Sequence, residues 1–281
     1  MRKIIDVRLR PPVGGFLKNS MYKDKERTAQ LGREFDLPPS VLKESMELLI
    51  EEMNSLGNYI GCVTGIKRGN DPVSGWIENK ELYEIAKKYP GKFLGIGAID
   101  ASDRRKALDD VDQCVNEYGF KAIIIEPGFH KTPMYADDRR LYPVYSKCAD
   151  IGIPVFLLVG GNNGPDISYT DPVHVEHVAE DMPDLKIVFN HGAWPWVPQV
   201  LQVVRRRSNI YLSADLYLTF PGTNHYIEAV NVFLSDRFFY GTGYPFAPLA
   251  GYFEKFKGLG IKDELMDKIL YKNLEKLLEL E

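Results

Sequence analysis

The amino-acid sequence predicts a (β/α)8 TIM barrel that forms one domain over residues 1–281. Short apolar segments bounded by turn residues alternate along the chain with segments of helical periodicity. This alternation is typical of a parallel sheet that helices cover on both faces. Eight such units in 281 residues fit a closed barrel better than an open doubly wound sheet. The open sheet is the alternative, but no glycine-rich phosphate-binding motif opens the first crossover.

The strands are expected at short runs of branched and aromatic residues that end in Gly, Pro or polar residues. These runs have the usual length of strands, whereas helices are usually longer. The expected strands are residues 4–9, 59–63, 93–99, 122–125, 154–159, 187–189, 210–212 and 238–240.

Helices are expected where apolar residues recur every three or four positions. Residues 41–56 carry such a stripe, and Pro39 and Pro172 suit the first turn of a helix, where the missing N–H costs nothing. Further helices are predicted over residues 104–118, 138–150, 172–181 and 263–281.

The connection over residues 11–37 is long and shows no clear periodicity. Long irregular loops in compact domains are usually functional. After the first strand of a barrel, this loop would lie over the catalytic face, so we expect a lid or pocket wall. A mobile surface loop is the alternative.

Composition excludes several classes of protein. With 44% hydrophobic and 26% charged residues, the chain is typical of a globular protein. A net charge of −4 and a pI near 5.8 argue against nucleic-acid binding, and the basic runs 23–27 and 205–207 are expected on the solvated surface. No apolar run reaches the ~18 residues of a membrane span, and no signal peptide precedes the first strand, so we expect a cytoplasmic protein without membrane contact.

The three cysteines, Cys62, Cys114 and Cys148, lie far apart in the sequence and form no C-x-x-C motif. Neither a disulfide framework nor a zinc ribbon is indicated. Each cysteine lies in an apolar strand-like or helical pattern, and free cysteines are among the most buried residues. We therefore expect all three to be small buried core residues.

Candidate functional residues are sought at the C-terminal ends of the strands, where barrel active sites form. The polar side chains expected there are Asp6, Arg8 and Arg10 from the first strand, Glu126 from the fourth, Asn190 and His191 from the sixth, Ser213 and Asp215 from the seventh, and Thr242 and Tyr244 from the eighth.

Asp6, Arg8 and Arg10 are two residues apart, so all three are expected on one side of their strand. If that side is the interior, two guanidinium groups lie buried, and each costs several kcal/mol unless an anion pairs with it. One interpretation is a pocket in which Arg8 and Arg10 bind a substrate carboxylate. The alternative is an internal ion-pair network with Asp6, Glu126 and Asp215.

His191 ends an apolar strand and precedes a Gly-Ala-Trp turn, a position that favours a general acid or base over a structural histidine. Asp215 and Glu126 are candidates for a second base or for partners of the arginines. His130 follows the fourth strand and is expected near the pocket mouth, where Trp194 would supply an apolar wall and Tyr244 would line the pocket.

His174 and His177 flank Glu176 on an expected helix. Their spacing is that of a pair of metal ligands, but without a third ligand such a pair is more typical of a helix surface. The loop over residues 160–166 is rich in backbone donors that can bind an anion, although glycine-rich loops of this kind are common.

Several segments together resemble the amidohydrolase-related family, whose (β/α)8 barrels include hydrolases and decarboxylases. Residues 4–10, Ile-Ile-Asp-Val-Arg-Leu-Arg, are similar to an opening strand Ile-Asp-x-His-x-His, and residues 239–245, Phe-Tyr-Gly-Thr-Gly-Tyr-Pro, resemble Phe-Gly-Ser-Asp-Tyr-Pro. Residues 119–123, 153–160, 187–195 and 269–278 resemble the family's fourth, fifth and sixth strands and its closing helix. The resemblance implies a barrel of the metal-dependent hydrolase type.

The chain departs from that family at its metal ligands. The positions of the two first-strand histidines, the fifth-strand histidine and the eighth-strand aspartate hold Arg8, Arg10, Leu158 and Gly243, and only His191 matches. One histidine and two cations do not make a zinc site. We therefore predict no metal and no other cofactor.

Lactonases of this family that act without metal imply one function, a metal-independent hydrolase of a small carboxylated lactone or ring ester. In that function Arg8 and Arg10 bind the carboxylate and polarise the carbonyl, while His191 or Asp215 activates water. One alternative is non-oxidative decarboxylation of a small carboxylic acid. Another is a barrel without activity that binds a small anion. The expected partner is a small anionic substrate, and the resemblance makes a homo-oligomer plausible.

Overall fold

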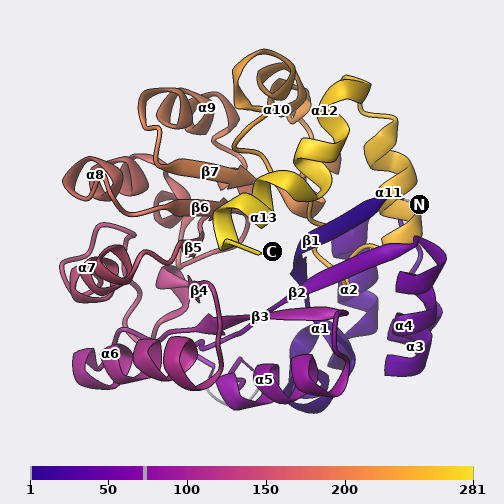
Figure 1. Ribbon diagram of the computed structural model, residues 1–281, viewed down its shortest axis with the longest axis horizontal. Helices are drawn as coiled ribbons and strands as arrows, with labels where there is room; N and C mark the ends of the chain where they lie inside the picture. The colour runs from indigo at the N-terminus through magenta and orange to yellow at the C-terminus, as the bar shows by residue number, and fades with distance from the viewer. Residues whose placement is uncertain (1, 72–74, 281) are drawn as a thin grey trace.

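The computed structural model describes residues 2–71 and 75–280 and confirms the barrel class. Seven parallel strands pair in sequence order, from β1 beside β2 to β6 beside β7, and helices form a ring outside them (Figure 1). The strands are β1 (Lys3–Leu9), β2 (Asn58–Thr64), β3 (Phe93–Ala98), β4 (Ile123–Ile125), β5 (Val155–Leu158), β6 (Ile187–Asn190) and β7 (Ile210–Ser213).

The expected eighth strand is present only as isolated bridges. Phe238 bridges Leu212 of β7, and Tyr244 bridges Leu9 of β1, both in parallel. The amide of Val7 also donates to the carbonyl of Tyr240 at 3.0 Å. The amide of Phe239 donates to the carbonyl of Leu212 at 3.0 Å, but the amide of Tyr240 donates to Ile269 and that of Thr242 to the Asp6 side chain. The segment thus connects the two edges of the sheet without forming a regular ladder.

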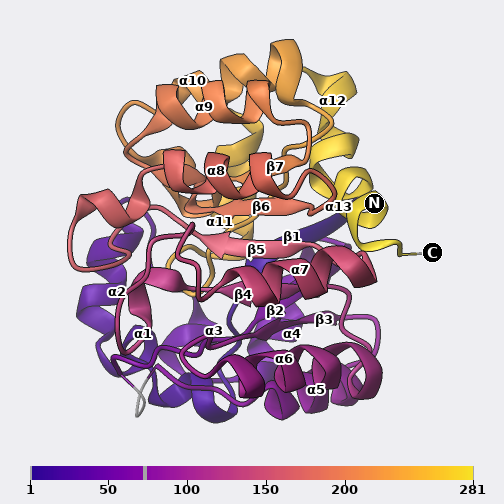
Figure 2. The same cartoon turned by 90° about the vertical axis from the view of Figure 1, so that its left-hand side faces the viewer.

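The helices follow the strands in alternation and cover the outside of the sheet (Figure 2). Most begin at a proline or at a polar capping residue; Asp103, for example, accepts a hydrogen bond from the amide of Lys106. The helices are α3 (Pro39–Leu42), α4 (Met46–Ser55), α5 (Asn79–Lys88), α6 (Arg104–Asp112), α7 (Tyr142–Ile151), α8 (Val173–Asp181), α9 (Val197–Arg206), α10 (Asn224–Ala229), α11 (Leu249–Lys257), α12 (Asp263–Asp267) and α13 (Asn273–Leu278).

The helix predicted over residues 41–56 is wrong as a single element, because the chain breaks between α3 and α4. Glu44 adopts a left-handed backbone with φ of 52°. Ser45 then starts a new helix, and its hydroxyl accepts a hydrogen bond from the amide of Leu48 at 3.3 Å. The periodicity persists across the break because both helices face the same core.

Three other predicted helices differ at their ends. The helix expected over residues 138–150 begins only at Tyr142, since residues 136–141 form turns. Residues 104–118 divide into α6 and a π-helical turn (Gln113–Glu117), and the terminal segment divides into α12, a π-helical turn (Lys268–Lys272) and α13.

The segment over residues 11–37 is more regular than its lack of periodicity predicts. It contains a 3-10 turn (Gly14–Lys18) and the short helices α1 (Ser20–Lys23) and α2 (Lys25–Gly32). The side chains of Asn19 and Asp24 cap the two helices by accepting from backbone amides. Elements this short leave too few turns to show a helical pattern in the sequence.

The two ends of the barrel interior differ in chemistry. At the N-terminal ends of the strands, inward residues such as Ile5, Val7 and Phe156 pack with Leu274 and Leu277 of α13, which crosses that end of the barrel (Figure 1). This apolar plug leaves the opposite end for polar groups. The three cysteines are buried and free, as predicted. In the described ranges, no helix is long and apolar enough to cross a membrane.

Candidate active site

A cavity of about 200 Å³ lies at the C-terminal ends of the strands. Four arginines line it, namely Arg8, Arg10, Arg27 and Arg68. Asp215 is the carboxylate among the described residues that line it. Much of the remaining wall is apolar and includes Met21, Leu31, Phe129, Leu158, Leu216 and Phe220. The cavity is therefore suited to a small molecule with negative charge and an apolar body.

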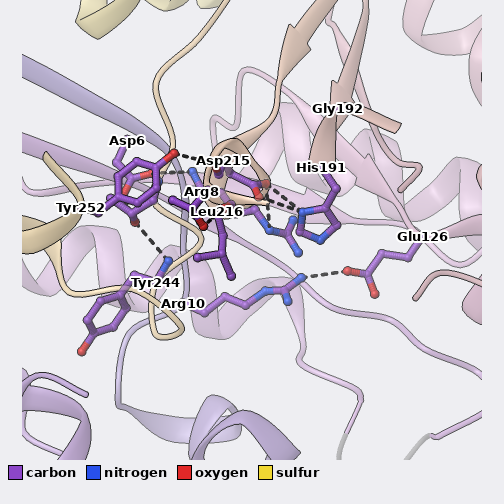
Figure 3. Close-up of polar contacts among 12 residues, drawn as sticks. Asp6, Arg8, Arg10, Glu126, His191, Gly192, Asp215, Leu216, Tyr244 and Tyr252 are labelled. Atoms are coloured by element: carbon purple, nitrogen blue, oxygen red, sulfur yellow. Dashed lines mark hydrogen bonds and ion pairs between the residues drawn. The ribbon is translucent and has the colours of Figure 1, made fainter. Parts of the chain in front are cut away.

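The first strand delivers Arg8 and Arg10 to this cavity, but not Asp6. The pairing register of β1 with β2 shifts between Asp6 and Leu9, and a bulge of this kind changes which side the following side chains face. The expectation that Asp6 shares a side with the two arginines is therefore wrong. Arg8 and Arg10 extend toward His191 and Glu126 while Asp6 lies behind them (Figure 3).

His191 and Asp215 form a hydrogen-bonded pair, and Arg8 lies beside them. These three residues are called the Asp215 cluster. The two carboxylate oxygens lie 3.0 and 2.9 Å from His191 Nδ1, and Arg8 Nε lies 3.7 Å from Asp215 Oδ2. Because the carboxylate only accepts, Nδ1 carries the proton. The other ring nitrogen, Nε2, is then the group of His191 that is available for proton transfer.

The backbone at this pair is strained. His191 has φ of 66° and Asp215 has φ of 39°, in a region that side chains with a Cβ seldom occupy. Ala193 also has a positive φ, and the hydroxyl of Tyr252 donates to the carbonyl of Asp215. Such strain is typical of functional sites, where the surrounding structure holds residues in unfavourable conformations.

Burial dominates the ionisation of the Asp215 cluster. Burial lowers the pKa of His191 below its usual value, and the charge of Arg8 lowers it further, although Asp215 opposes both. The imidazole is therefore neutral at pH 7 in the free protein. Burial also lowers the pKa of Arg8, against the effect of Asp215 and Glu126. Arg8 is only 3% exposed, and its Nη1 has no hydrogen-bond partner within residues 2–71 and 75–280.

A second group, here called the Glu126 cluster, is formed by Glu126, Arg10 and Arg68. Arg10 Nη2 donates to Glu126 Oε1 at 2.8 Å, and Arg68 bonds to both carboxylate oxygens. Burial raises the pKa of Glu126, but the two guanidinium groups lower it by more, to about 2. Burial and the charge of Arg8 lower the pKa of Arg10 to about 9, so this cluster keeps its charges at neutral pH.

Asp6 belongs to a hydrogen-bond network beneath the site. It accepts from Tyr59 Oη at 2.8 Å, from the hydroxyl and amide of Thr242, and from the amide of Arg8 at 2.9 Å. Burial raises the pKa of Asp6 to about 6 despite these four donors. Asp6 thus fixes the backbone of the two closing segments and does not pair with the arginines.

Three other predicted site residues lie outside the cavity wall. His130 is fully buried; its Nε2 accepts from the amide of Ala101 at 2.9 Å, and its Nδ1 faces the carbonyls of Glu126 and Pro127. The hydroxyl of Tyr244 lies 2.8 Å from Ser40 Oγ and points away from the cavity (Figure 3). Trp194 stacks on Tyr217, which does line the cavity, so it supports the wall from behind.

Sequence reasoning missed two of the four arginines. Arg68 follows β2 in an irregular segment where no pattern indicates an inward side chain. Arg27 belongs to a charged run and is exposed to solvent as expected, but the sequence did not indicate that α2 also brings it to the cavity mouth. The loop over residues 160–166 contributes Gly160, Asn162 and Asn163 to the wall.

Comparison with known proteins gives the family. A model of the family described as amidohydrolase matches residues 73–280. The chain belongs to the amidohydrolase family. The match begins after β1 and β2, so the segment that carries Arg8 and Arg10 lies outside it.

Proteins similar to this chain include decarboxylases, hydratases and a barrel described only by its fold. The gamma-resorcylate decarboxylase of Rhizobium sp. (strain MTP-10005) is 22% identical over 246 residues, which are 72% of this chain and 75% of the relative. A TIM-barrel protein from Bordetella bronchiseptica, whose crystal structure describes it as uncharacterized, is 44% identical with a TM-score of 0.93, over 99% of this chain and 98% of that chain.

A third similar structure is a dihydroxybenzoic acid decarboxylase from Polaromonas sp. JS666, solved with bound manganese and the inhibitor 2-nitroresorcinol. Its TM-score is 0.68 and its identity 20%, over 100% of this chain and 98% of that chain. A likeness at this level of identity shows the shared fold alone.

Proposed function

We propose that this protein is a decarboxylase that removes carbon dioxide from a small acid carrying at least one further carboxylate, without a metal ion in the barrel. The observation that carries this proposal is the buried guanidinium of Arg8, whose Nη1 is unpartnered, beside the His191–Asp215 pair. The similarity to gamma-resorcylate decarboxylases supports decarboxylation over the hydrolysis of a lactone.

The charge balance of the site favours a substrate with two negative charges. Four guanidinium groups line the cavity; Asp215 pairs with Arg8, Glu126 pairs with Arg10 and Arg68, and the exposed Arg27 stands at the mouth. The buried cations Arg8 and Arg10 require compensation, and Arg binds carboxylates through paired N–H donors. A ligand with two carboxylates would supply the missing charge and the missing partner of Arg8 Nη1.

The residues present do not fit the metal site that the family resemblance implies. Its expected ligand positions hold Arg8, Arg10, Leu158 and Gly243. A guanidinium has no lone pair to offer a metal, and His191 Nδ1 is already bonded to Asp215. A single histidine cannot supply the three or four ligands of a zinc site. Charge stabilisation in this cavity therefore rests on the arginines.

The reaction that follows from this arrangement is an exchange of carbon dioxide for a proton. An anionic substrate next to His191 raises the pKa of the imidazole, so substrate binding promotes its protonation. His191 Nε2 then donates its proton to the carbon that carries the carboxylate. The carbon–carbon bond breaks, its electron pair returns to the unsaturated framework, and carbon dioxide leaves. Arg8 and Arg10 hold the carboxylate that remains, and water restores the proton on His191.

Hydrolysis of a carboxylated lactone is the second candidate, because the His191–Asp215 pair could also act as a base that activates water. In the free protein His191 is neutral, and a neutral Nε2 accepts a proton from water. Glu126 is not a competing base, since its pKa of about 2 makes it a weak acceptor. An inactive barrel plugged by ion pairs is disfavoured because Arg8 Nη1 is left without a partner.

The test is product analysis with a panel of acids. Carbon dioxide release is measured with 5-carboxyvanillate as a dicarboxylate, with 2,6-dihydroxybenzoate as a monocarboxylate, and with other unsaturated dicarboxylates. Carboxylated lactones are scored separately for ring opening. We expect carbon dioxide release with higher kcat/KM for dicarboxylates. Ring opening without carbon dioxide release would replace the proposal with the hydrolase function.

The pH dependence of kcat/KM separates the same two functions. Decarboxylation consumes a proton, so kcat/KM falls as pH rises above the pKa of His191, which lies below its ordinary value of about 6.5. If His191 acts as a base in hydrolysis, kcat/KM instead rises with pH and reaches a plateau above the pKa of His191.

A further inference from the structure

Three side chains with metal-ligating atoms meet on the outside of the barrel, away from the cavity. Asp137 comes from the turns before α7, and His174 and His177 come from the first turns of α8, beside α7 in Figure 1. The Nδ1 atoms of His174 and His177 lie 2.9 and 2.7 Å from the two oxygens of Asp137. All three ligand atoms lie within 4.8 Å of one another. The sequence shows only the two histidines, and the fold brings Asp137 beside them as a third possible ligand.

We propose that Asp137, His174 and His177 form a binding site for a divalent transition metal ion of the zinc class. Imidazole and carboxylate groups suit Zn²⁺, Co²⁺ and Ni²⁺ better than Ca²⁺ or Mg²⁺, which prefer oxygen ligands alone. Three protein ligands leave a coordination position for water. The site is independent of the reaction proposed for the barrel cavity, because none of the three residues lines that cavity.

The contact between His174 and Asp137 is close but poorly aligned for a hydrogen bond. Nδ1 of His174 is buried and lies 2.9 Å from Asp137 Oδ1, without a well-aligned partner among the described residues. A buried polar atom without a partner costs free energy. A cation placed between the nitrogen and the carboxylate would satisfy both, since a metal bond needs the nitrogen lone pair and not an N–H directed at oxygen.

The ring of His174 is held in place by aromatic stacking. Its centroid lies 4.3 Å from that of Tyr135, which in turn stacks on Tyr169 at 4.4 Å with planes 12° apart. The hydroxyl of Tyr135 also lies 3.0 Å from Ser168 Oγ. A ligand fixed before the metal arrives loses little side-chain entropy when it binds.

The other two ligands are ready to complete the site. Asp137 directs one carboxylate oxygen toward the Nδ1 atom of each histidine. The side chain of His177 is 53% exposed, and this exposure lets a metal enter from solvent and lets the ring adjust.

A metal at this position would join two connections of the barrel. It would tie the turn after β4 to α8 and, through Tyr135 and Tyr169, to the loop after β5. That loop packs closely, because a Cβ on Gly164 would lie 2.4 Å from the Cβ of Tyr169. The same loop contributes Asn162 and Asn163 to the cavity wall. The ion would therefore act as a structural clip beside the active site.

The experiment is calorimetric titration of zinc chloride into tag-free, chelator-treated full-length protein. We expect one equivalent to bind, with affinity at least ~10-fold lower in His177→Gln and binding lost in the His174→Ala/His177→Ala double variant. The controls are His225→Ala, which removes an exposed histidine paired with Glu228, and His191→Ala, which removes the cavity histidine. Both are expected to bind one equivalent as the parent protein does.

Far-UV circular dichroism verifies that each variant is folded, and His177→Gln keeps the test valid if the double variant does not fold, because that side chain is half exposed. A visible absorption spectrum of the Co²⁺ form reports nitrogen and oxygen ligands independently. Absence of zinc binding to the parent protein would overturn the proposal. Binding retained by folded His174→Ala/His177→Ala, or lost in His191→Ala alone, would also overturn it.

Discussion

The two charged clusters of the cavity use the same types of residue and have opposite character. In the Glu126 cluster, one carboxylate is bonded by two arginines, and both of its oxygens are occupied. In the Asp215 cluster, one carboxylate is shared between Arg8 at 3.7 Å and His191 at 2.9 Å, and Arg8 Nη1 is left without a partner. The carboxylate of the first cluster is saturated by its two arginines, although Arg10 Nε also lacks a partner among the described residues, and the second cluster leaves Arg8 Nη1 for a ligand.

The difference indicates which residues act in chemistry and which hold the cavity together. A carboxylate with a pKa of about 2 between two arginines transfers no protons at neutral pH. A histidine whose other ring nitrogen is free does. Of the two interpretations of the arginines made from sequence, the internal ion-pair network describes the bonds of Glu126 with Arg10 and Arg68. The anion-binding pocket stays a proposal, which rests on the unpartnered Arg8 Nη1 and Arg10 Nε.

The largest expected effect is on catalysis, from removing the proton donor of the Asp215 cluster. His191→Asn should lower kcat by about 10²- to 10⁴-fold, with little loss of stability, because Asn tolerates the left-handed backbone at this position. Steady-state kinetics and thermal unfolding measure the two effects. If His191→Asn leaves kcat unchanged, the Asp215 cluster is not the chemical half of the site.

The second effect is on stability, from opening the Glu126 cluster. Glu126→Gln leaves the buried Arg10 and the partly exposed Arg68 without their anion and should lower the free energy of unfolding by about 3–5 kcal/mol in urea denaturation. Glu228→Gln, at an exposed pair with His225, is the matched control and should change little. Equal stability of the two variants would show that the Glu126 cluster contributes no net stability.

The third prediction concerns Arg8, which should affect ligand binding more than stability. Arg8→Met removes the partner of a substrate carboxylate and should cost about 2–5 kcal/mol in kcat/KM. Because the charge of Arg8 lowers the pKa of His191, the variant should also shift the alkaline limb of the pH profile to higher pH. A shift to lower pH would contradict the assigned electrostatic coupling.

The smallest effect is a pH dependence of stability from Asp6, outside both clusters. Its pKa is raised from 3.8 to about 6, so the folded state binds a proton that the unfolded state has released. The free energy of unfolding should therefore fall by roughly 3 kcal/mol as pH rises from about 4 to 6.

Glu126 should change the free energy of unfolding in the opposite direction at lower pH. Because its pKa is lowered in the folded state, the free energy of unfolding should fall as pH drops from about 4.5 toward 2. Urea denaturation across this range, with Asp6→Asn as comparison, separates the two.

Sequence patterns predicted the barrel because its strands are continuous apolar runs, and burial on both faces leaves a clear signal. They did not predict the break at Glu44, because helical periodicity continues across it. They also misplaced Asp6, because strict alternation along a strand assumes a regular register, and β1 is bulged after that residue.

For the site, the sequence indicated His191, Asp215, Arg8 and Arg10 because strand ends converge in a barrel. It did not indicate Arg68, whose inward direction depends on an irregular segment, or the partnership of Asp137 with His174 and His177, which depends on contacts between segments far apart in the chain. Tyr244 was expected at the cavity from its place in the eighth segment, but its side chain turns toward Ser40.

The most direct test of the central claim, that arginines replace a metal in this barrel, is carbon dioxide release by chelator-dialysed protein. The folded His174→Ala/His177→Ala variant is used so that the proposed surface ion does not contribute. Turnover that is retained after chelation and unchanged by added Mn²⁺ or Zn²⁺ is the predicted result. Turnover that is lost on chelation and restored by Mn²⁺ would contradict the account and would require metal ligands other than Arg8 and Arg10.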